Sequence, residues 1–259
     1  MSSIVVITGA DPRHQYFIDR LAESFQLSAV FCESPHYPTP SFTNDDDRKV
    51  WDWFFNRREE YELKNFESHK SKSQKNIPPT TTLQAGEIHS EKFIDKLQRL
   101  KPDFIAIFGT SIFQSLYLEN FSSITFNLHL GLPQYYRGSS CNFWPIHDLQ
   151  LEHLGATVHQ INSGIDTGMI AVQKHTPLET GDDEQTLAGK TILIGVQLMI
   201  DVIHRWQNGT LELTPSDMAG PLYRIKDFDT RSIARVKEFV QTGQLKDQIN
   251  RLLSNERSI

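Results

Sequence analysis

Two polar side chains near the end of an apolar run could act together on a carbonyl group. The run 124–129 alternates apolar with polar side chains, which predicts an extended strand. Because side chains two residues apart on a strand point to the same side, Asn127 and His129 are predicted to face one point. An amide donor and an imidazole aimed at one point could stabilise an oxyanion. A lone histidine at a strand end is more often structural, so the prediction rests on the pair.

A third candidate, Asp166, lies in the glycine-flanked segment Gly164–Gly168. Glycines let a loop approach a ligand closely. A carboxylate near His129 would orient the ring and favour its protonated form, and it could help to remove the proton of an attacking amine. Aspartate is also common in turns that its own side chain stabilises. Periodicity and spacing leave these two interpretations of Asp166 open.

The elements around these residues follow the alternation of an α/β sheet. The predicted strands are the runs 4–7, 29–32, 104–108, 124–129, 156–161 and 169–173. The predicted helices are 15–25, 91–100, 114–116, 142–151, 186–206 and 233–253. This alternation predicts an α/β sheet built from βαβ units. Ligands bind such sheets at the carboxyl ends of the strands, where Asn127 and His129 are expected.

The segment 35–79 interrupts this alternation. Its aromatic and charged stretch 51–61 is expected to be helical, and its basic run 69–75 is expected to be a solvated loop or a phosphate contact. We therefore predict a catalytic domain over 1–209 that contains this insertion. A short C-terminal extension over 210–259 is predicted to follow it.

The composition is that of a soluble globular protein. Of the 259 residues, 38% are hydrophobic and 22% charged, and the formal net charge of −6 argues against nucleic-acid or membrane binding as the main activity. The two cysteines, Cys32 and Cys141, have no metal-site spacing and are predicted to be buried thiols. No apolar stretch reaches the length of a membrane span, and the first ten residues do not form a signal peptide. We expect a cytoplasmic protein.

The motifs around the three candidate residues resemble those of the folate-dependent formyltransferase family. Two blocks carry the resemblance in the right order, and a third precedes them. They are Phe126-Asn127-Leu128-His129 with Leu132-Pro133 and Tyr136-Arg137-Gly138, then Gly155–His159 with Gly164-Ile165-Asp166-Thr167-Gly168, and, before both, Phe108–Phe113. The similarity is specific over residues 80–205 and general elsewhere.

The resemblance implies an α/β fold that is Rossmann-like, with a mostly parallel sheet and flanking helices, and it implies a role for each residue. It implies 10-formyltetrahydrofolate as co-substrate and no metal. It implies that Asn127 and His129 stabilise the oxyanion, while Asp166 positions His129, keeps it charged and helps to move the amine proton. The residues implied to line the pocket of the folate's pterin ring are Phe108, Gly109, Ser111, Ile112, Asn162, Gly164 and Ile165.

The motifs define the acceptor amine less sharply. Leu130 and Gly131 stand where many family members have proline and serine, which leaves the acceptor in doubt. Methionyl-tRNA formyltransferases carry a further C-terminal barrel domain. Glycinamide ribonucleotide formyltransferases lack a counterpart of the insertion and of the tail at 223–228. Enzymes that formylate nucleotide-linked amino-deoxysugars, for bacterial surface polysaccharides such as lipopolysaccharide O-antigen, combine a compact core with variable additions.

We therefore predict an N-formyltransferase that acts on a nucleotide-linked amino-deoxysugar, with the two other acceptors as alternatives. A formyltetrahydrofolate hydrolase and a regulatory protein on the same fold are further alternatives, since fold does not fix function. Possible contacts to the acceptor come from Arg13, Arg137, Gly138 and His159. The sugar position, the nucleotide base and the oligomeric state, including a homodimer, are left open.

Overall fold

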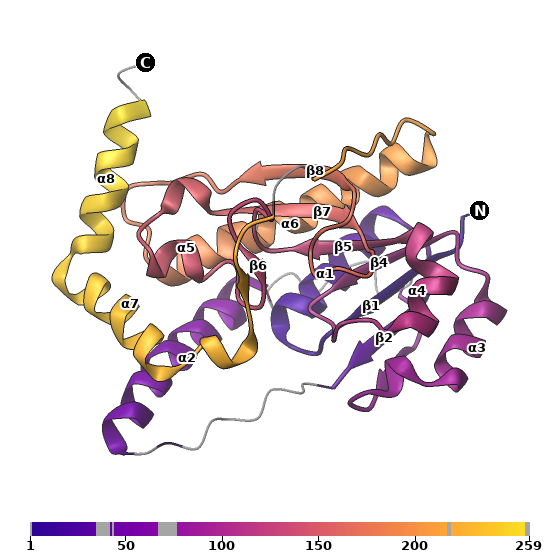
Figure 1. The fold of residues 1–259 in the computed structure, drawn as a ribbon, viewed down its shortest axis with the longest axis horizontal. Helices are drawn as coiled ribbons and strands as arrows, with labels where there is room; N and C mark the ends of the chain where they lie inside the picture. The colour runs from indigo at the N-terminus through magenta and orange to yellow at the C-terminus, as the bar shows by residue number, and fades with distance from the viewer. Residues whose placement is uncertain (1, 35–41, 43, 67–76, 217–218, 257–259) are drawn as a thin grey trace.

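A seven-stranded sheet runs through the centre of the molecule, and helices cover both of its faces (Figure 1). This computed structural model describes residues 2–34, 42, 44–66, 77–216 and 219–256. In spatial order the strands are β3 (Thr80–Leu83), β2 (Leu27–Glu33), β1 (Ile4–Thr8), β4 (Phe104–Phe108), β5 (Thr125–His129), β7 (Gly155–Gln160) and β8 (Ile170–His175).

The first five strands in that order are parallel, whereas β7 runs antiparallel to both β5 and β8. The predicted Rossmann-like, mostly parallel α/β fold is confirmed. The edge strand β3 was not predicted, because its three threonines and single leucine form no apolar run. A separate two-stranded parallel sheet joins β6 (Arg137–Gly138) to β9 (Leu222–Tyr223).

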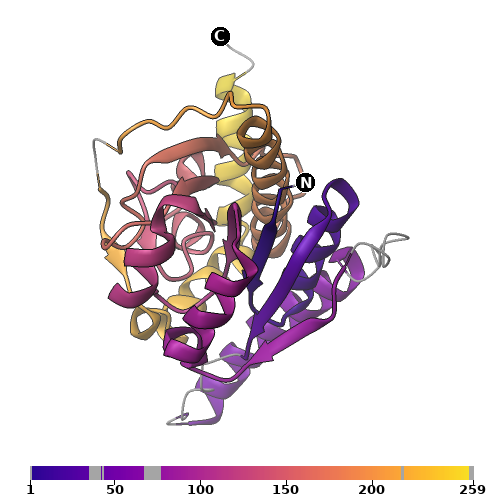
Figure 2. The same ribbon diagram turned by 90° about the vertical axis from the view of Figure 1, so that its right-hand side faces the viewer.

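Helices lie on both faces of the main sheet (Figure 2), and others pack beyond it. They are α1 (Pro12–Ser24), α2 (Asp45–Phe66), α3 (Glu91–Leu100), α4 (Ser115–Phe121), α5 (Trp144–His147), α6 (Glu184–Gln207), α7 (Thr230–Thr242) and α8 (Gln244–Glu256). Short 3₁₀ turns occupy Glu87–His89, Ser122–Ile124, Leu151–His153 and Ile225–Asp227.

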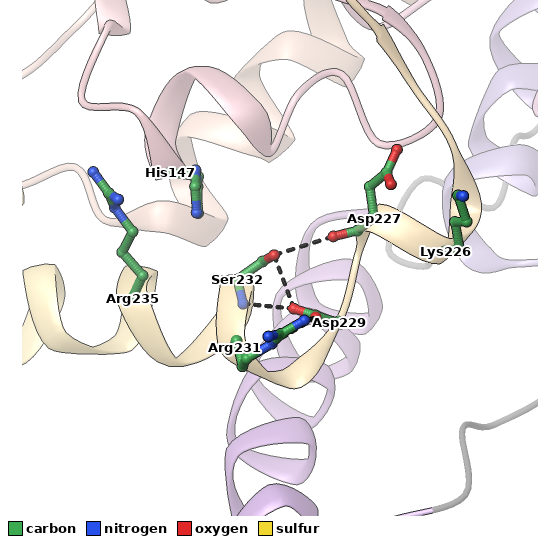
Figure 3. A pocket seen from close by; sticks show the side chains of 7 residues that line it. All are labelled: His147, Lys226, Asp227, Asp229, Arg231, Ser232 and Arg235. Atoms are coloured by element: carbon green, nitrogen blue, oxygen red, sulfur yellow. Dashed lines mark hydrogen bonds and ion pairs between the residues drawn. The ribbon is translucent and has the colours of Figure 1, made fainter.

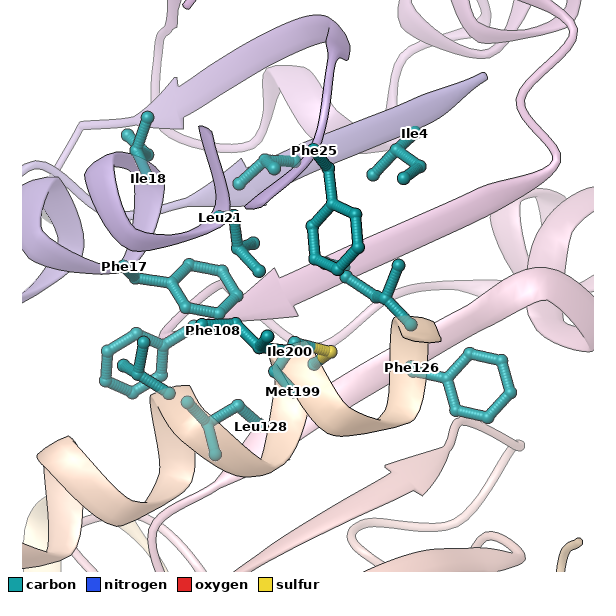
Figure 4. Close-up of a cluster of buried hydrophobic side chains, with 14 of the residues drawn as sticks. Ile4, Phe17, Ile18, Leu21, Phe25, Phe108, Phe126, Leu128, Met199 and Ile200 are labelled. Atoms are coloured by element: carbon teal, nitrogen blue, oxygen red, sulfur yellow. The ribbon is translucent and has the colours of Figure 1, made fainter. Parts of the chain in front are cut away.

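Alternation along the strands separates two apolar layers. The layer under α1 and α6 takes Phe104, Ala106 and Phe108 from β4, and Figure 4 shows Phe108 beside Phe17 of α1. The layer under α3 and α4 takes Ile105 and Ile107 from the same strand. Because successive side chains point to opposite faces, any residue in register with Ile107 lies on the α3–α4 side of the sheet.

α6 is the central helix of the first layer. It packs against β5, β7 and β8. Within the described residues, α6 is long and apolar enough to span a membrane. However, 61% of its most apolar stretch is buried inside the fold. That burial is what a helix in the centre of an α/β protein requires, because it must cover the sheet.

A second apolar cluster, which we call the second core, lies beyond the sheet. Its buried members are Phe54, Tyr136, Cys141, Phe143, Trp144, Ile146, Leu151, Leu154, Leu187, Ile233, Val236, Phe239, Leu245 and Ile249. It joins α2, from the predicted insertion, to α5, α7 and α8, and in Figure 1 these helices gather at the end of the molecule away from the N-terminus. Arg57 adds ion pairs from α2 to Asp183 and Glu184 at the start of α6. The basic run 69–75 lies outside the described residues.

Two helix predictions were wrong in extent. The helix expected over 142–151 is only one turn, α5, because Leu149 adopts a left-handed φ of 53° that ends it. The helix expected over 233–253 is two helices, α7 and α8, which meet at Gly243 with a φ of 83°.

Candidate active site

β5 carries the first two candidate residues to the carboxyl edge of the sheet. Asn127 is in register with Ile107 of β4 and with His159 of β7, so its side chain lies on the α3–α4 side. His129, two residues later, points to the same side and is buried. Asn127 and His129 therefore point to the same side of the sheet, as predicted.

Asp166 brings the cluster together. Its carboxylate Oδ2 accepts a hydrogen bond from the backbone N–H of Gly138 at 2.7 Å and lies 3.4 Å from His129 Nδ1. Its Oδ1 lies 3.3 Å from His159 Nε2 and 3.5 Å from Asn127 Nδ2. The Asp166 side chain is only 10% exposed. Four nitrogen atoms surround it, of which the Gly138 N–H and the Asn127 amide donate hydrogen bonds.

The loop that holds Asp166 is shaped by its own polar side chains. Asn162 Oδ1 accepts hydrogen bonds from the Gly164 N–H at 2.9 Å and from the Thr167 hydroxyl at 3.0 Å. Asp166 itself adopts a φ of 51°, a conformation that aspartate tolerates better than most residues. Asn162 and Gly164, which the resemblance implied for pterin binding, therefore help to set the position of the Asp166 loop.

Burial and neighbouring groups set the charges of this cluster. Burial alone would raise the pKa of Asp166, but the imidazoles of His129 and His159 and the Gly138 N–H hold it well below its usual range. Burial lowers the pKa of His129, and the attraction of Asp166 offsets only part of this. Burial and the carboxylate thus act on the pKa of His129 in opposite directions, and the expectation that Asp166 keeps the ring charged stays a prediction.

His129 is held on its second nitrogen as well. Its Nε2 lies 3.0 Å from the carbonyl oxygen of Tyr136, which fixes the plane of the ring. A Cβ on Gly131 would lie 2.5 Å from the same Nε2. Glycine at position 131 therefore leaves room for the His129 ring. In the sequence, the only sign of this contact is that Gly131 follows His129 by two residues.

The C-terminal segment reaches this site through the small sheet. Arg137 Nε donates to the Gly220 carbonyl at 2.8 Å, and its Nη1 donates to the Ile165 carbonyl at 3.2 Å. Gly138 has a φ of 92°, and any Cβ there would collide with the Tyr223 carbonyl oxygen. Arg137 and Gly138, predicted as acceptor contacts, here tie β9 and the Asp166 loop together.

His159, the last residue of the motif block Gly155–His159 and a predicted contact to the acceptor, belongs to the cluster. Its Nε2 lies 3.1 Å from Asn127 Nδ2, in addition to its contact with Asp166, and its Nδ1 lies 3.0 Å from the Gln160 carbonyl oxygen. The ring is 3% exposed. It supports the amide of Asn127 and the carboxylate from the side away from His129.

The segment after β4 supplies the other residues implied for the pterin pocket. The Phe108 side chain is buried in the first apolar layer, so only its backbone is available to a ligand. The N–H and hydroxyl of Ser111 both donate to the buried carboxylate of Glu33, at 2.8 and 2.9 Å. Ile112 is 67% exposed, an apolar side chain facing outward from a loop that Glu33 anchors. Sequence reasoning missed Glu33, because it ends a strand without a motif around it.

Arg13 is not brought to the cluster. It lies at the start of α1, where its guanidinium pairs with the buried carboxylate of Glu62 at 2.8 Å and with Asp11. Glu62 also accepts from Arg58 at 2.9 Å. Arg13 therefore links α1 to α2. Its guanidinium is already paired with carboxylates, whereas a phosphate contact would need it to be free.

Two further features complete the description of possible ligand sites. In the part of the chain that the structure describes, no three His, Cys, Asp or Glu side chains are grouped to hold a metal ion. A surface hollow lies at the start of α7, lined by His147, Lys226, Asp227, Asp229, Arg231, Ser232 and Arg235 (Figure 3). Its acidic groups serve local structure, since Asp229 caps α7 and pairs with Arg231, and none of its residues belongs to the cluster around Asp166.

The sequence of this chain matches a known protein family and several curated proteins. The sequence model of the formyl transferase family matches residues 54–203, more than half of the chain. The methionyl-tRNA formyltransferase of Geobacter metallireducens is 28% identical over 166 residues, which cover 60% of this chain and 53% of that protein. The chain spans about half the length of the curated relatives it matches.

Solved structures of similar fold include formyltransferases of different kinds. An N-formyltransferase from Helicobacter canadensis, in complex with folinic acid and dTDP-3-aminofucose, has a TM-score of 0.58 at 16% identity and covers 92% of this chain and 82% of its own. A phosphoribosylglycinamide formyltransferase from Streptococcus pneumoniae has a TM-score of 0.53 at 18% identity, with coverages of 80% and 99%. These likenesses concern the fold.

Proposed function

Because the chain belongs to the formyl transferase family, we propose that it transfers a formyl group from 10-formyltetrahydrofolate to a primary amine. One observation carries the proposal: Asn127, His129 and Asp166 converge at the carboxyl edge of the sheet. An amide donor, an imidazole and an ionised carboxylate at one point are the groups that acyl transfer to an amine requires.

The chemistry follows from these groups. The amine nitrogen attacks the formyl carbon, and the carbonyl π electrons move onto its oxygen, where the Asn127 amide N–H stabilises the negative charge. The contacts of Asn127 Nδ2, at 3.1 and 3.5 Å, include one at the limit of a hydrogen bond, so the amide can turn toward a bound carbonyl. The tetrahedral intermediate then collapses, and N10 of tetrahydrofolate leaves with a proton.

The proton of the attacking amine needs an acceptor. The lowered pKa of His129 makes its neutral form available at neutral pH, and a proton on Nδ1 would face Asp166 Oδ2. The pKa of Asp166 lies far below its usual range, so the carboxylate stays ionised and balances the imidazolium that forms. In this proposal Asp166 holds the charge, while His129 moves the proton.

For the acceptor, we propose the amino group of a nucleotide-linked amino-deoxysugar. The support is the overall likeness to the Helicobacter canadensis enzyme, whose solved complex holds dTDP-3-aminofucose and folinic acid, and which matches nearly the whole described fold. Methionyl-tRNA is the second candidate, since the curated relatives in sequence carry that name. The two acceptors differ so greatly in size that one assay separates them.

The test measures tetrahydrofolate released from 10-formyltetrahydrofolate by the purified chain. Three mixtures are compared: no amine, methionyl-tRNA, and a panel of UDP- and dTDP-linked amino-deoxysugars. Release that depends on one of the amino sugars supports the proposal. Release with methionyl-tRNA alone would make methionyl-tRNA the acceptor in place of an amino sugar. Release without any amine would indicate a hydrolase. No release with any mixture would overturn the transferase assignment.

A further inference from the structure

A buried carboxylate, Glu33, ends β2 at the carboxyl edge of the sheet, outside the cluster around Asp166. Its residue is 4% exposed. Both hydrogen-bond donors that the structure gives it belong to Ser111, whose N–H donates to Oε2 at 2.8 Å and whose hydroxyl donates to Oε1 at 2.9 Å. A buried carboxylate costs free energy unless donors compensate it. The need to satisfy Glu33 therefore holds Ser111 in place.

This contact joins parts of the sheet that are not adjacent. β1 lies between β2, which ends in Glu33, and β4, which leads into Ser111. Phe31, two residues before Glu33, packs in the α3–α4 layer, so Glu33 points to the same side of the sheet. Asn127, on the strand next to β4, also lies on that side. Glu33 therefore holds the loop after β4 on the face that carries the Asn127 amide.

Side chains, and not a backbone ladder, hold this loop. From Thr110 to Phe113, the described residues form no backbone-to-backbone hydrogen bond. Phe113 is buried, and its ring stacks on Tyr117 at a centroid distance of 3.9 Å. Ile112, between the anchored Ser111 and Phe113, is 67% exposed. Because both of its neighbours are fixed, the outward direction of Ile112 is fixed as well.

The loop offers what a flat heterocycle such as a pterin needs. Such ligands bind to apolar side chains and to a few well-placed polar groups, often of the backbone. Ile112 supplies an exposed apolar side chain, and the loop around it has backbone groups that are not used in a ladder. Because β4 pairs with β5, a ring bound here lies on the side of the Asn127 amide.

We propose that Glu33 is a positioning residue for the formyl donor: through Ser111 it holds the loop 110–113 in the conformation that binds the pterin ring. The proposal rests on the proposed function and adds a residue that touches neither co-substrate. A loop that is ordered before the donor arrives loses less conformational freedom on binding. The acceptor amine does not depend on this anchor.

The experiment measures the Kd of folinic acid by fluorescence, without any amine, in the wild type, Glu33→Leu and Glu33→Gln. Leucine has a similar size but removes both acceptors. Glutamine keeps an oxygen for the Ser111 N–H, and its amide can donate to the Ser111 hydroxyl, which is free to rotate. We expect the Kd to rise about tenfold in Glu33→Leu and to stay within about threefold of wild type in Glu33→Gln.

Ser111→Ala tests whether Glu33 acts through this one residue. The variant removes the hydroxyl bond and keeps the N–H bond, so the Kd should rise about threefold. Added to Glu33→Leu, it should have no further effect, because the bond it removes is already lost. The matched control is Ser232→Ala at the start of α7. Ser232 donates its N–H and hydroxyl to Asp229 at 2.9 and 3.0 Å, and its loss should leave the Kd unchanged.

An unchanged Kd in both Glu33→Leu and Ser111→Ala overturns the inference. Effects that simply add in the double variant also overturn it, as does a rise in KM for the acceptor amine as large as the rise in Kd. If urea unfolding shows that Glu33→Leu does not fold, Ser111→Ala decides against Ser232→Ala. A wild-type chain that binds no folinic acid contradicts the proposed formyl donor itself, a different failure.

Discussion

The cluster around Asp166 and the second core show two opposite ways of using buried space. In the cluster, polar groups lie 2.7–3.5 Å apart, and each contact has a directional partner. In the second core, aromatic rings of Phe54, Phe143 and Phe228 meet at centroid distances of 4.7–5.7 Å and need only be apolar and large. The cluster therefore should govern turnover, whereas the second core should govern stability.

The two regions are nevertheless connected. β9 leaves the site at Tyr223, and the chain passes Phe228 in the second core before it forms α7. Tyr136 belongs to the second core by its side chain and holds His129 by its carbonyl oxygen. Substitutions that separate turnover from stability thus test whether the division of roles holds despite these shared residues.

Asp166→Asn should produce the largest loss. Asparagine tolerates the left-handed φ at this position, so the loop is kept while the negative charge is removed. We expect amine-dependent transfer to fall by about 10²–10⁴-fold, the range associated with a positioned acid–base group. Initial rates of tetrahydrofolate release measure it, with Asp95→Asn on the exposed face of α3 as the matched control. Wild-type rates in Asp166→Asn would refute the role of the carboxylate.

Phe54→Ala should lower the stability of the protein and leave its turnover largely unchanged. The Phe54 side chain is 8% exposed and contacts the rings of Phe143, just before α5, and Phe228, before α7. We expect the free energy of unfolding to fall by about 3 kcal/mol, as for other buried phenylalanines. Urea unfolding measures it, and Leu63→Ala on the same helix, 41% exposed, should change it by less than about 0.5 kcal/mol. Equal effects of the two variants would mean that the second core is not a stabilising unit.

Arg137→Gln should have a smaller effect on turnover, because the residue acts through the Asp166 loop. Loss of its bonds to the Gly220 and Ile165 carbonyls is expected to lower kcat about tenfold. Arg137→Lys should restore little, since an ammonium lacks the planar fork that reaches both carbonyls. Full activity in the lysine variant would show that the charge alone matters, as for a contact to an anionic acceptor.

The two regions differ in how much of their structure could be predicted from the sequence. Strong apolar runs predicted β4 and α3 with their observed bounds, and the motif residues Asn127, His129 and Asp166 are in mutual contact. The second core was not foreseen, because α2 and α7 lie far apart in the chain and carry no shared motif. Nor was the place of β9, a strand of two residues. The balance between burial and Asp166 that sets the pKa of His129 could not be predicted, since burial cannot be read from the spacing of residues.

The charge state of this pair is the central claim of the proposed mechanism: an ionised carboxylate beside an imidazole whose pKa burial lowers. A histidine with a depressed pKa binds its proton less readily in the folded chain than in the unfolded chain. It therefore contributes stability above the unfolded value near 6.5 and loses that contribution as the pH falls below it.

The most direct measurement is an NMR titration of the His129 ring, with the signal assigned by its loss in His129→Ala. We predict a midpoint below the ordinary value of 6.5 in the free protein. A midpoint at or above 6.5 would mean that Asp166 outweighs burial and keeps the ring charged, which would contradict the proposed path of the proton.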